Sequence, residues 1–314
     1  MLETLPEELL GTSTEASRLR RFIEDASAEP GPVIFTGEPG TGKHVIARML
    51  HEHSPRQEAP YLMVDCSLFY ERELKRELFG YVAPGGKGKS RKGLFEFASD
   101  GTCYLARIEE LSSGIQEVLL EFLRTGRFAR LGDGKPISSS VRILASSSKN
   151  LAGFVNAGLF DDDLYRRLSA WSLRLAPLRE RREDIPAIVD ALTHAHTRDR
   201  PAVHSPIWSA DALQALKAYP WPGNMDELSR EVRRLVESGV PSVLPEHLAV
   251  EVASSWLGQR GDPEIRRVLD ELDGYIREFR ILSRLDLSYG DLLDAASNQW
   301  KGSFPSRREP PSEE

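Results

Sequence analysis

The 314-residue chain is poor in cysteine and has no long apolar run. Its two cysteines, Cys66 and Cys103, lie in apolar, strand-like segments, so we expect buried reduced thiols rather than a disulfide or a zinc site. No run approaches the roughly 20 apolar residues of a membrane helix, and the N-terminus lacks a charged-then-apolar leader. These absences predict a cytoplasmic protein with no membrane partner.

An excess of positive charge is also absent. The formal net charge is −7, which gives no support for broad electrostatic binding to nucleic acid, so no direct DNA binding is predicted. Metal-binding histidine pairs are missing as well. His51 and His53, like His194 and His196, are two residues apart on predicted helices and therefore point away from each other. We predict no metal site from these side chains.

The most informative stretch that is present covers residues 31–51, GPVIFTGEPGTGKHVIARMLH. Val33–Phe35 predicts a short buried strand, and an amphipathic helix follows the glycines. Between them the spacing G-x-x-x-x-G-K is met from Gly37 to Lys43, so backbone N–H groups, the helix dipole and the lysine can all face a phosphate. The alternative is a glycine-rich turn that binds nothing, but the strand before it and the helix after it favour a P-loop.

The P-loop predicts ATP or ADP as the cofactor. The usual Ser or Thr ligand of magnesium is replaced by His44, so Mg²⁺ binding is in question. The predicted nucleotide-binding residues are Gly37, Glu38, Pro39, Gly40, Thr41, Gly42, Lys43 and His44.

Strands and helices alternate up to Pro177, and the pattern is wholly helical beyond it. This order predicts an α/β fold, with a parallel sheet covered on both faces, followed by an all-α domain. The capping-box pattern from Thr12 to Glu15 predicts the start of a helix before the P-loop strand. Further strands are predicted at Tyr61–Val64, Thr102–Leu105, Val141–Ala145 and Leu173–Leu175, and late helices at Ile185–His196, Ala210–Tyr219, Met225–Ser238 and Pro245–Val252.

The order of motifs resembles the AAA+ domain of bacterial sigma-54-dependent transcription activators, the enhancer-binding proteins. The likeness runs from about Leu9 to Val252 and rests on a dozen short motifs. They include LLGTS (Leu9–Ser13), the P-loop, SPR (Ser54–Arg56), ELFG (Glu77–Gly80), GLFEFASDGTCYL (Gly93–Leu105), GRFARLG (Gly126–Gly132), VRILAS (Val141–Ser146), DLYRRLS (Asp163–Ser169), LAPLRERREDI (Leu175–Ile185) and YPWPGN (Tyr219–Asn224).

The resemblance implies a P-loop AAA+ αβα core with a five-stranded parallel sheet and a helical lid, assembled into rings with ATP at subunit interfaces. We expect the core at residues 1–176 and the lid at 177–255. A helical C-terminal extension is expected at 256–302, where Ile265–Leu282 has helical periodicity, and a disordered tail at 303–314.

The chain departs from the family at the residues that carry out hydrolysis. Family members have Asp-Glu at the end of the third strand, where Asp holds magnesium and Glu prepares the attacking water. These positions are Ala106 and Arg107 here, which predicts crippled hydrolysis. Glu109 and Glu110 lie nearby, and a minor alternative is that one of them substitutes.

Other functional positions of the family are changed too. The sensor Asn is Ser148, the sensor Arg after W-P-G-N is Asp226, and the first of two trans-acting arginines falls on Asp161. The second is kept as Arg167, an arginine-finger candidate. The family Asn that switches the catalytic Glu is replaced by Asp65, so we predict a bidentate ion pair between Asp65 and Arg107. The alternatives are that both side chains are solvated or that Arg107 pairs with Glu109 or Glu110.

The family's sigma-contacting GAFTGA motif is missing from residues 81–93, a glycine-rich basic segment that predicts an exposed loop. Three functions remain open. The first is a pseudo-ATPase that binds ATP or ADP and regulates transcription by interacting with an active sigma-54 activator, homologous subunits or another protein. The second is an active ATPase with relocated catalytic groups, and the third is a nucleotide-free interaction scaffold.

Overall fold

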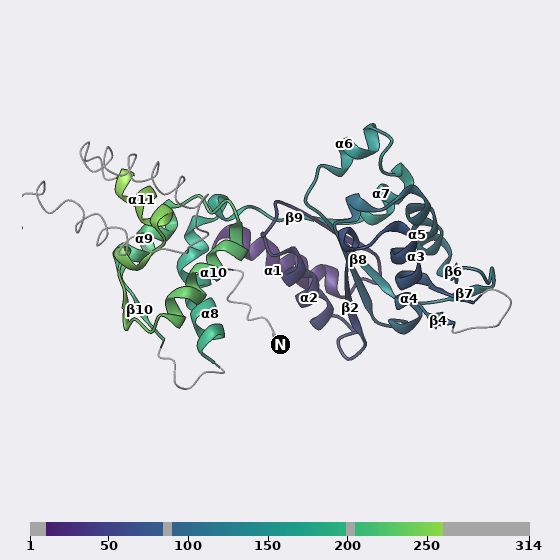
Figure 1. Ribbon diagram of the computed structural model, residues 1–314, viewed down its shortest axis with the longest axis horizontal. Helices are drawn as coiled ribbons and strands as arrows, with labels where there is room; N and C mark the ends of the chain where they lie inside the picture. Colours follow the sequence, from purple (N-terminus) through teal and green to yellow (C-terminus); the bar gives the residue numbers. More distant parts are fainter. Residues whose placement is uncertain (1–10, 84–89, 199–204, 260–314) are drawn as a thin grey trace, which may run out of the picture. The chain divides into compact units, whose positions relative to one another are not determined.

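The computed structural model describes residues 11–83, 90–198 and 205–259 (Figure 1). The chain forms two compact units, one of Met1–Ile188 with Trp221–Leu228 and the other of Val189–Pro220 with Ser229–Glu314. The predicted C-terminal extension and tail, including the helix at Ile265–Leu282, lie outside the described residues except for the end of one helix. No described helix is long and apolar enough to cross a membrane.

A five-stranded parallel sheet forms the centre of the first unit, as the sequence predicts. The strand order is β2-β5-β8-β1-β9, and every neighbouring pair is parallel. Each predicted strand is confirmed to within two residues at either end. The strands are β1 (Val33–Thr36), β2 (Tyr61–Asp65), β5 (Thr102–Ala106), β8 (Arg142–Ser147) and β9 (Trp171–Arg174).

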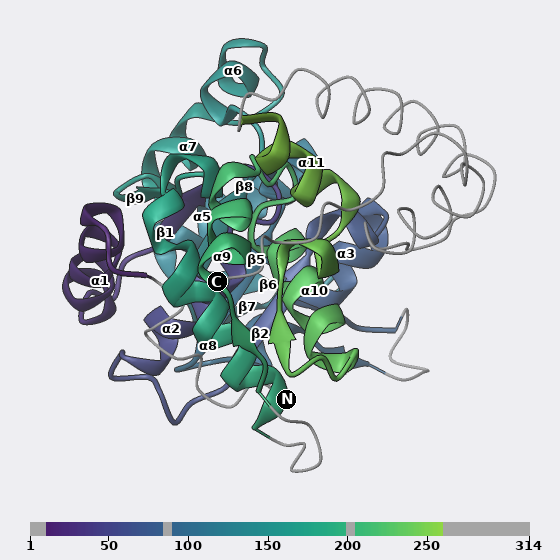
Figure 2. The ribbon, with the colours of Figure 1, turned by 90° about the vertical axis from the view of Figure 1, so that its left-hand side faces the viewer.

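Helices cover both faces of this sheet (Figure 2). α1 (Thr14–Ser27) and α2 (Lys43–Glu52) pack on one face, and α3 (Glu71–Phe79) and α5 (Ser113–Thr125) on the other. Alternate residues of one strand therefore enter different cores. In β5, Tyr104 packs with α1 and α2, whereas Leu105 packs with α3 and α5.

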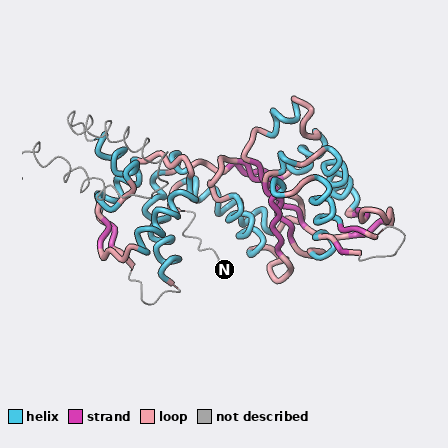
Figure 3. The backbone as a smooth tube through the Cα atoms, viewed as in Figure 1, coloured by secondary structure: helices cyan, strands magenta, loops and turns pink. Residues whose placement is uncertain are grey.

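Shorter elements complete the first unit (Figure 3). The ends of the basic loop pair as a small antiparallel hairpin that the sequence did not predict. The bounds of these elements are η2 (Cys66–Leu68), β3 (Gly80–Tyr81), β4 (Arg91–Lys92), α4 (Leu94–Phe97), η4 (Ile108–Glu110), β6 (Arg127–Ala129), β7 (Pro136–Ser138), α6 (Leu151–Asn156), α7 (Asp162–Leu168), η5 (Leu178–Glu180) and η6 (Arg182–Asp184).

The second unit is mainly helical, as expected. α9 (Ala210–Ala218) packs on α11 (Val250–Gln259), and a two-stranded parallel ladder joins β10 (Ile207–Trp208) to β11 (Ser242–Val243). The helix expected at Pro245–Val252 is wrong in extent, because a 3₁₀ turn, η7, ends at His247 before α11 begins. The remaining elements are α8 (Ile185–Thr197), α10 (Asn224–Glu237) and η7 (Pro245–His247), of which α8 and α10 each begin in the first unit.

The start of α1 differs from the predicted capping box. The N-cap is Ser13 rather than Thr12, and its hydroxyl accepts a hydrogen bond from the Ala16 N–H at 3.1 Å. The reason lies far away in the sequence, at the fully buried Asp184. One Asp184 oxygen accepts from the N–H groups of Thr12 (2.7 Å) and Ser13 (2.6 Å), and the other from the Ser13 hydroxyl (2.7 Å). The carboxylate therefore fixes the chain where the helix begins.

We expect Asp184→Ala to destabilise the first unit by about 3 kcal/mol, because three donors lose a charged acceptor in a buried place. Urea unfolding of the purified chain measures the change. Glu183→Ala is the matched control, since Glu183 is the exposed neighbouring acid. An equal, small effect of both substitutions would contradict this role for Asp184.

Candidate nucleotide-binding site

The carboxyl ends of the parallel strands bring several of the predicted site residues to one edge of the sheet. Thr36 of β1 is in register with Ser147 of β8, and Asp65 of β2 with Ala106 of β5. The P-loop, Arg107 and Ser148 follow these strand ends directly. Open parallel sheets bind their ligands at this edge, which is therefore the candidate site.

The P-loop has the curled backbone that its glycines predict. Gly40 has φ +76°, and a Cβ at this position would lie 2.2 Å from the carbonyl oxygen of Gly223. Gly42 is left-handed at the N-cap of α2. The loop N–H groups and the start of a ten-residue helix thus meet at one place, which is the arrangement that binds phosphate.

Lys43 lies in the first turn of α2 and is largely buried. Its ammonium donates to the carbonyl oxygens of Gly37 and Glu38, both at 2.7 Å. Burial lowers the pKa of Lys43 to about 8, although the charges of Glu109, Asp226 and Glu38 partly offset this effect. The lysine is therefore cationic at pH 7 and surrounded by acceptors that a phosphate can replace. His44, on the same turn, is exposed.

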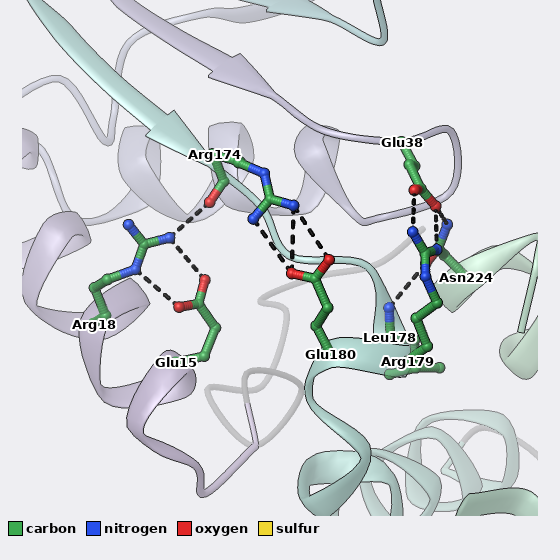
Figure 4. Close-up of polar contacts among 8 residues, drawn as sticks. All are labelled: Glu15, Arg18, Glu38, Arg174, Leu178, Arg179, Glu180 and Asn224. Carbon is green, nitrogen blue, oxygen red and sulfur yellow. Dashed lines mark hydrogen bonds and ion pairs between the residues drawn. The ribbon is translucent and has the colours of Figure 1, made fainter. Parts of the chain in front are cut away.

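Two side chains that the sequence analysis did not single out hold the P-loop in place (Figure 4). The Arg179 guanidinium forms a bidentate pair with Glu38, with N···O distances of 2.7 and 2.6 Å, and holds the pKa of Glu38 at about 2. The fully buried Asn224 donates to the Pro39 carbonyl at 2.9 Å and accepts from the Leu178 N–H at 2.9 Å. Both residues belong to family motifs, Arg179 to LAPLRERREDI and Asn224 to YPWPGN, but a motif alone does not reveal what each side chain contacts.

Asp65 and Arg107 form the predicted bidentate pair. The Arg107 Nε donates to one Asp65 oxygen at 2.7 Å, and a terminal nitrogen donates to the other. Burial raises the pKa of Asp65, but the bonds from Arg107 and Ser67 outweigh it, so the pKa lies below its usual range. The Arg107 side chain remains 46% exposed, so the pair is a partly solvated one rather than a deeply buried one.

Arg107 also shapes the backbone, because its φ of +57° is left-handed and turns the chain directly after β5. The turn leads into η4, where Glu109 is buried (8% exposed) and Glu110 is exposed. One Glu109 oxygen accepts from the Ser148 N–H at 3.2 Å. The structure thus brings Glu109, a minor alternative in the sequence analysis, to the sensor position.

Of the two trans-acting arginine positions, the substituted one has a structural role. The Asp161 carboxylate caps α7 by accepting from the Leu164 N–H at 2.7 Å. Arg167 is exposed in the last turn of the same helix. Asp226 lies in the first turn of α10, close enough to raise the pKa of Lys43. Among the described residues no group of three His, Cys, Asp or Glu side chains could hold a metal ion.

Comparisons with known proteins define the class. The sigma-54 interaction domain family matches residues 9–174, and the AAA+ ATPase lid domain family matches residues 179–256. The chain belongs to the sigma-54 interaction domain family, and it is an AAA+ protein of the sigma-54-dependent transcription regulator type.

Particular relatives agree with this family. The DNA-binding transcriptional regulator NtrC of Rhizobium meliloti (strain 1021) is 36% identical over 229 residues, which are 72% of this chain and 47% of that protein. The response regulator PilR of Pseudomonas aeruginosa is 32% identical over 274 residues, 86% of this chain and 61% of that protein. The chain spans about half the length of the curated relatives it matches.

A solved structure also resembles the chain over almost its whole length. NtrX from Brucella abortus in complex with ATP has a TM-score of 0.70 and 27% identity, and the likeness covers 95% of this chain and 67% of that one. The same protein in complex with ADP gives a TM-score of 0.69.

A double-mutant cycle with Asp65→Asn and Arg107→Gln should show a favourable coupling of about 0.5–1 kcal/mol, the range of partly exposed ion pairs. Asn at position 65 can still accept from the Ser67 N–H, which donates to Asp65 at 3.1 Å, so the cycle isolates the pair. Urea unfolding at low salt supplies the four stabilities. Strictly additive effects would contradict the interaction in solution.

Proposed function

We propose that this chain binds ATP or ADP through its P-loop, hydrolyses it poorly or not at all, and regulates transcription through a protein partner. The observation that carries the proposal is the contrast within one site. The phosphate-binding backbone and Lys43 are in place, whereas the end of β5 offers Ala106 and an arginine tied to Asp65. The NtrX structures with ATP and ADP support a nucleotide as the ligand.

Hydrolysis needs a group that positions or deprotonates the attacking water, and usually a carboxylate near the magnesium ion. Ala106 has no polar side-chain atom, and Arg107 is cationic, so neither can accept a proton from water. The ion pair also holds Arg107 at Asp65, where the family's switch pair would move. Binding without efficient cleavage is what this set of groups supports best.

The organisation that we propose is a core of residues 1–176, a helical lid of 177–255 and a C-terminal extension of 256–302 before the tail. The family matches at 9–174 and 179–256 support the first two parts. The partner that fits best is a subunit of the same family, either an active sigma-54 activator or another copy of this chain, in the cytoplasm. Arg167 is the residue that we propose reaches a neighbouring subunit's nucleotide.

Lys43→Ala should weaken ATP and ADP binding by about 10- to 100-fold, because the phosphates lose one charge-assisted contact. Calorimetric titration of the purified chain measures the affinities. Lys92→Ala, which removes an exposed lysine of β4, is the control and should leave them unchanged. Absence of nucleotide binding to the wild type, or equal affinities of the wild type and Lys43→Ala, would favour the scaffold alternative.

Addition of this protein to an active sigma-54 activator should change the activator's ATPase rate if mixed assemblies form, since an arginine supplied by a neighbouring subunit can strongly accelerate phosphoryl transfer. Arg167→Ala should abolish the change. Arg166→Ala is the matched control, because Arg166 lies beside Arg167 but pairs with Asp162 of its own helix. A rate that stays constant at a large excess of this protein would contradict mixed assembly.

A further inference from the structure

Glu109 presents a buried carboxylate oxygen with no hydrogen-bond partner among the described residues. The residue is only 8% exposed, and its other oxygen is occupied by the Ser148 N–H at 3.2 Å. A buried polar atom normally has a partner, and an ionised carboxylate is especially costly to bury alone. The free oxygen therefore indicates a missing ligand with donor or cationic character.

The position of Glu109 indicates which ligand this is. η4 follows β5 at the carboxyl edge of the sheet, the same edge that carries the P-loop after β1. Glu109 is also the acidic group with the largest charge effect on Lys43, whose pKa it raises. The Glu109 carboxylate therefore lies near the Lys43 ammonium, which is the group expected to contact the phosphates. No Lys or Arg side chain of the described residues forms an ion pair with it.

Two of the other carboxylates near the loop already have an arginine partner. Glu38 is engaged by Arg179, and Asp65 by Arg107. Glu110, the next residue along the chain, is exposed to solvent. Magnesium that accompanies a nucleotide needs only one or two protein carboxylates, because phosphate oxygens and waters complete its octahedron. One protein carboxylate oxygen is therefore sufficient for a cation that enters with the ligand.

We propose that Glu109 is the carboxylate that this site offers to the divalent cation of a bound nucleotide, in place of the acidic side chain missing at Ala106. The assignment rests on the proposed nucleotide binding, since the phosphates bring the cation to the loop. It makes Glu109 a binding residue and requires no turnover. Glu109→Gln retains the shape and the acceptor for Ser148 but removes the charge that holds the cation.

The experiment measures ATP affinity by calorimetry with Mg²⁺ and with a chelator, for the wild type, Glu109→Gln and the matched control Glu110→Gln. We expect Mg²⁺ to strengthen binding to the wild type and to Glu110→Gln by about tenfold or more, and to leave Glu109→Gln nearly unchanged. With the chelator, Glu109→Gln should bind ATP at least as tightly as the wild type, because the substitution removes a negative charge near the phosphates.

Thermal unfolding without nucleotide separates this role from a structural one. Glu109→Gln should unfold at nearly the same temperature as the wild type, because the amide keeps the shape of the side chain and an acceptor for the Ser148 N–H. A markedly lower temperature would assign Glu109 a structural role instead, and an equal response of the wild type and Glu109→Gln to Mg²⁺ would overturn its assignment as the carboxylate of the cation. No ATP binding to the wild type under either condition would overturn the proposed function and this assignment with it.

Discussion

The curled conformation of the P-loop, which hydrogen bonds from distant residues hold in place, is the constraint on which the rest of the site depends. The backbone N–H groups of a P-loop can face a phosphate only while the loop remains curled, so other residues must hold its carbonyl oxygens and side chains. Asn224 and the Met225 N–H do this at Pro39 and Gly40, and Arg179 does it at Glu38. Gly40 permits the close approach of Gly223, which a Cβ would block. These contacts hold the P-loop of the first unit in its curled conformation.

The edge beside that loop has a different chemistry from the one the family resemblance implies. Arg107 stands where the resemblance implies a carboxylate. Its side chain bonds to Asp65 at the strand end, and its left-handed backbone turns the chain after β5. The turn buries Glu109 next to the sensor position. One backbone conformation, the left-handed turn at Arg107, therefore links the arginine at the end of β5 to the buried acid two residues later.

Much of this structure could be predicted from the sequence where the signal is local. Buried strands, the glycine spacing of the P-loop and the late helices follow from periodicity and composition. The Asp65–Arg107 pair follows from opposite charges at two positions that the family resemblance places side by side. The rest depends on contacts between distant segments. The N-cap at Ser13 depends on its bond to Asp184, and the position of Glu38 depends on its ion pair with Arg179. The burial of Glu109 depends on the turn at Arg107. Residue type alone does not show which neighbour a side chain will meet.

Single-turnover hydrolysis tests most directly whether the chain holds ATP without cleaving it. Purified protein is held in large excess over labelled ATP and well above the dissociation constant, with Mg²⁺ not limiting, so that every nucleotide is bound. Slow product release then cannot hide the chemical step. We predict that the bound ATP is recovered intact after hours, at a rate close to that of ATP free in the same buffer. Conversion of the bound ATP to ADP within seconds to minutes, abolished by Lys43→Ala, would show a working catalytic centre and contradict a nucleotide-binding protein that has lost hydrolysis.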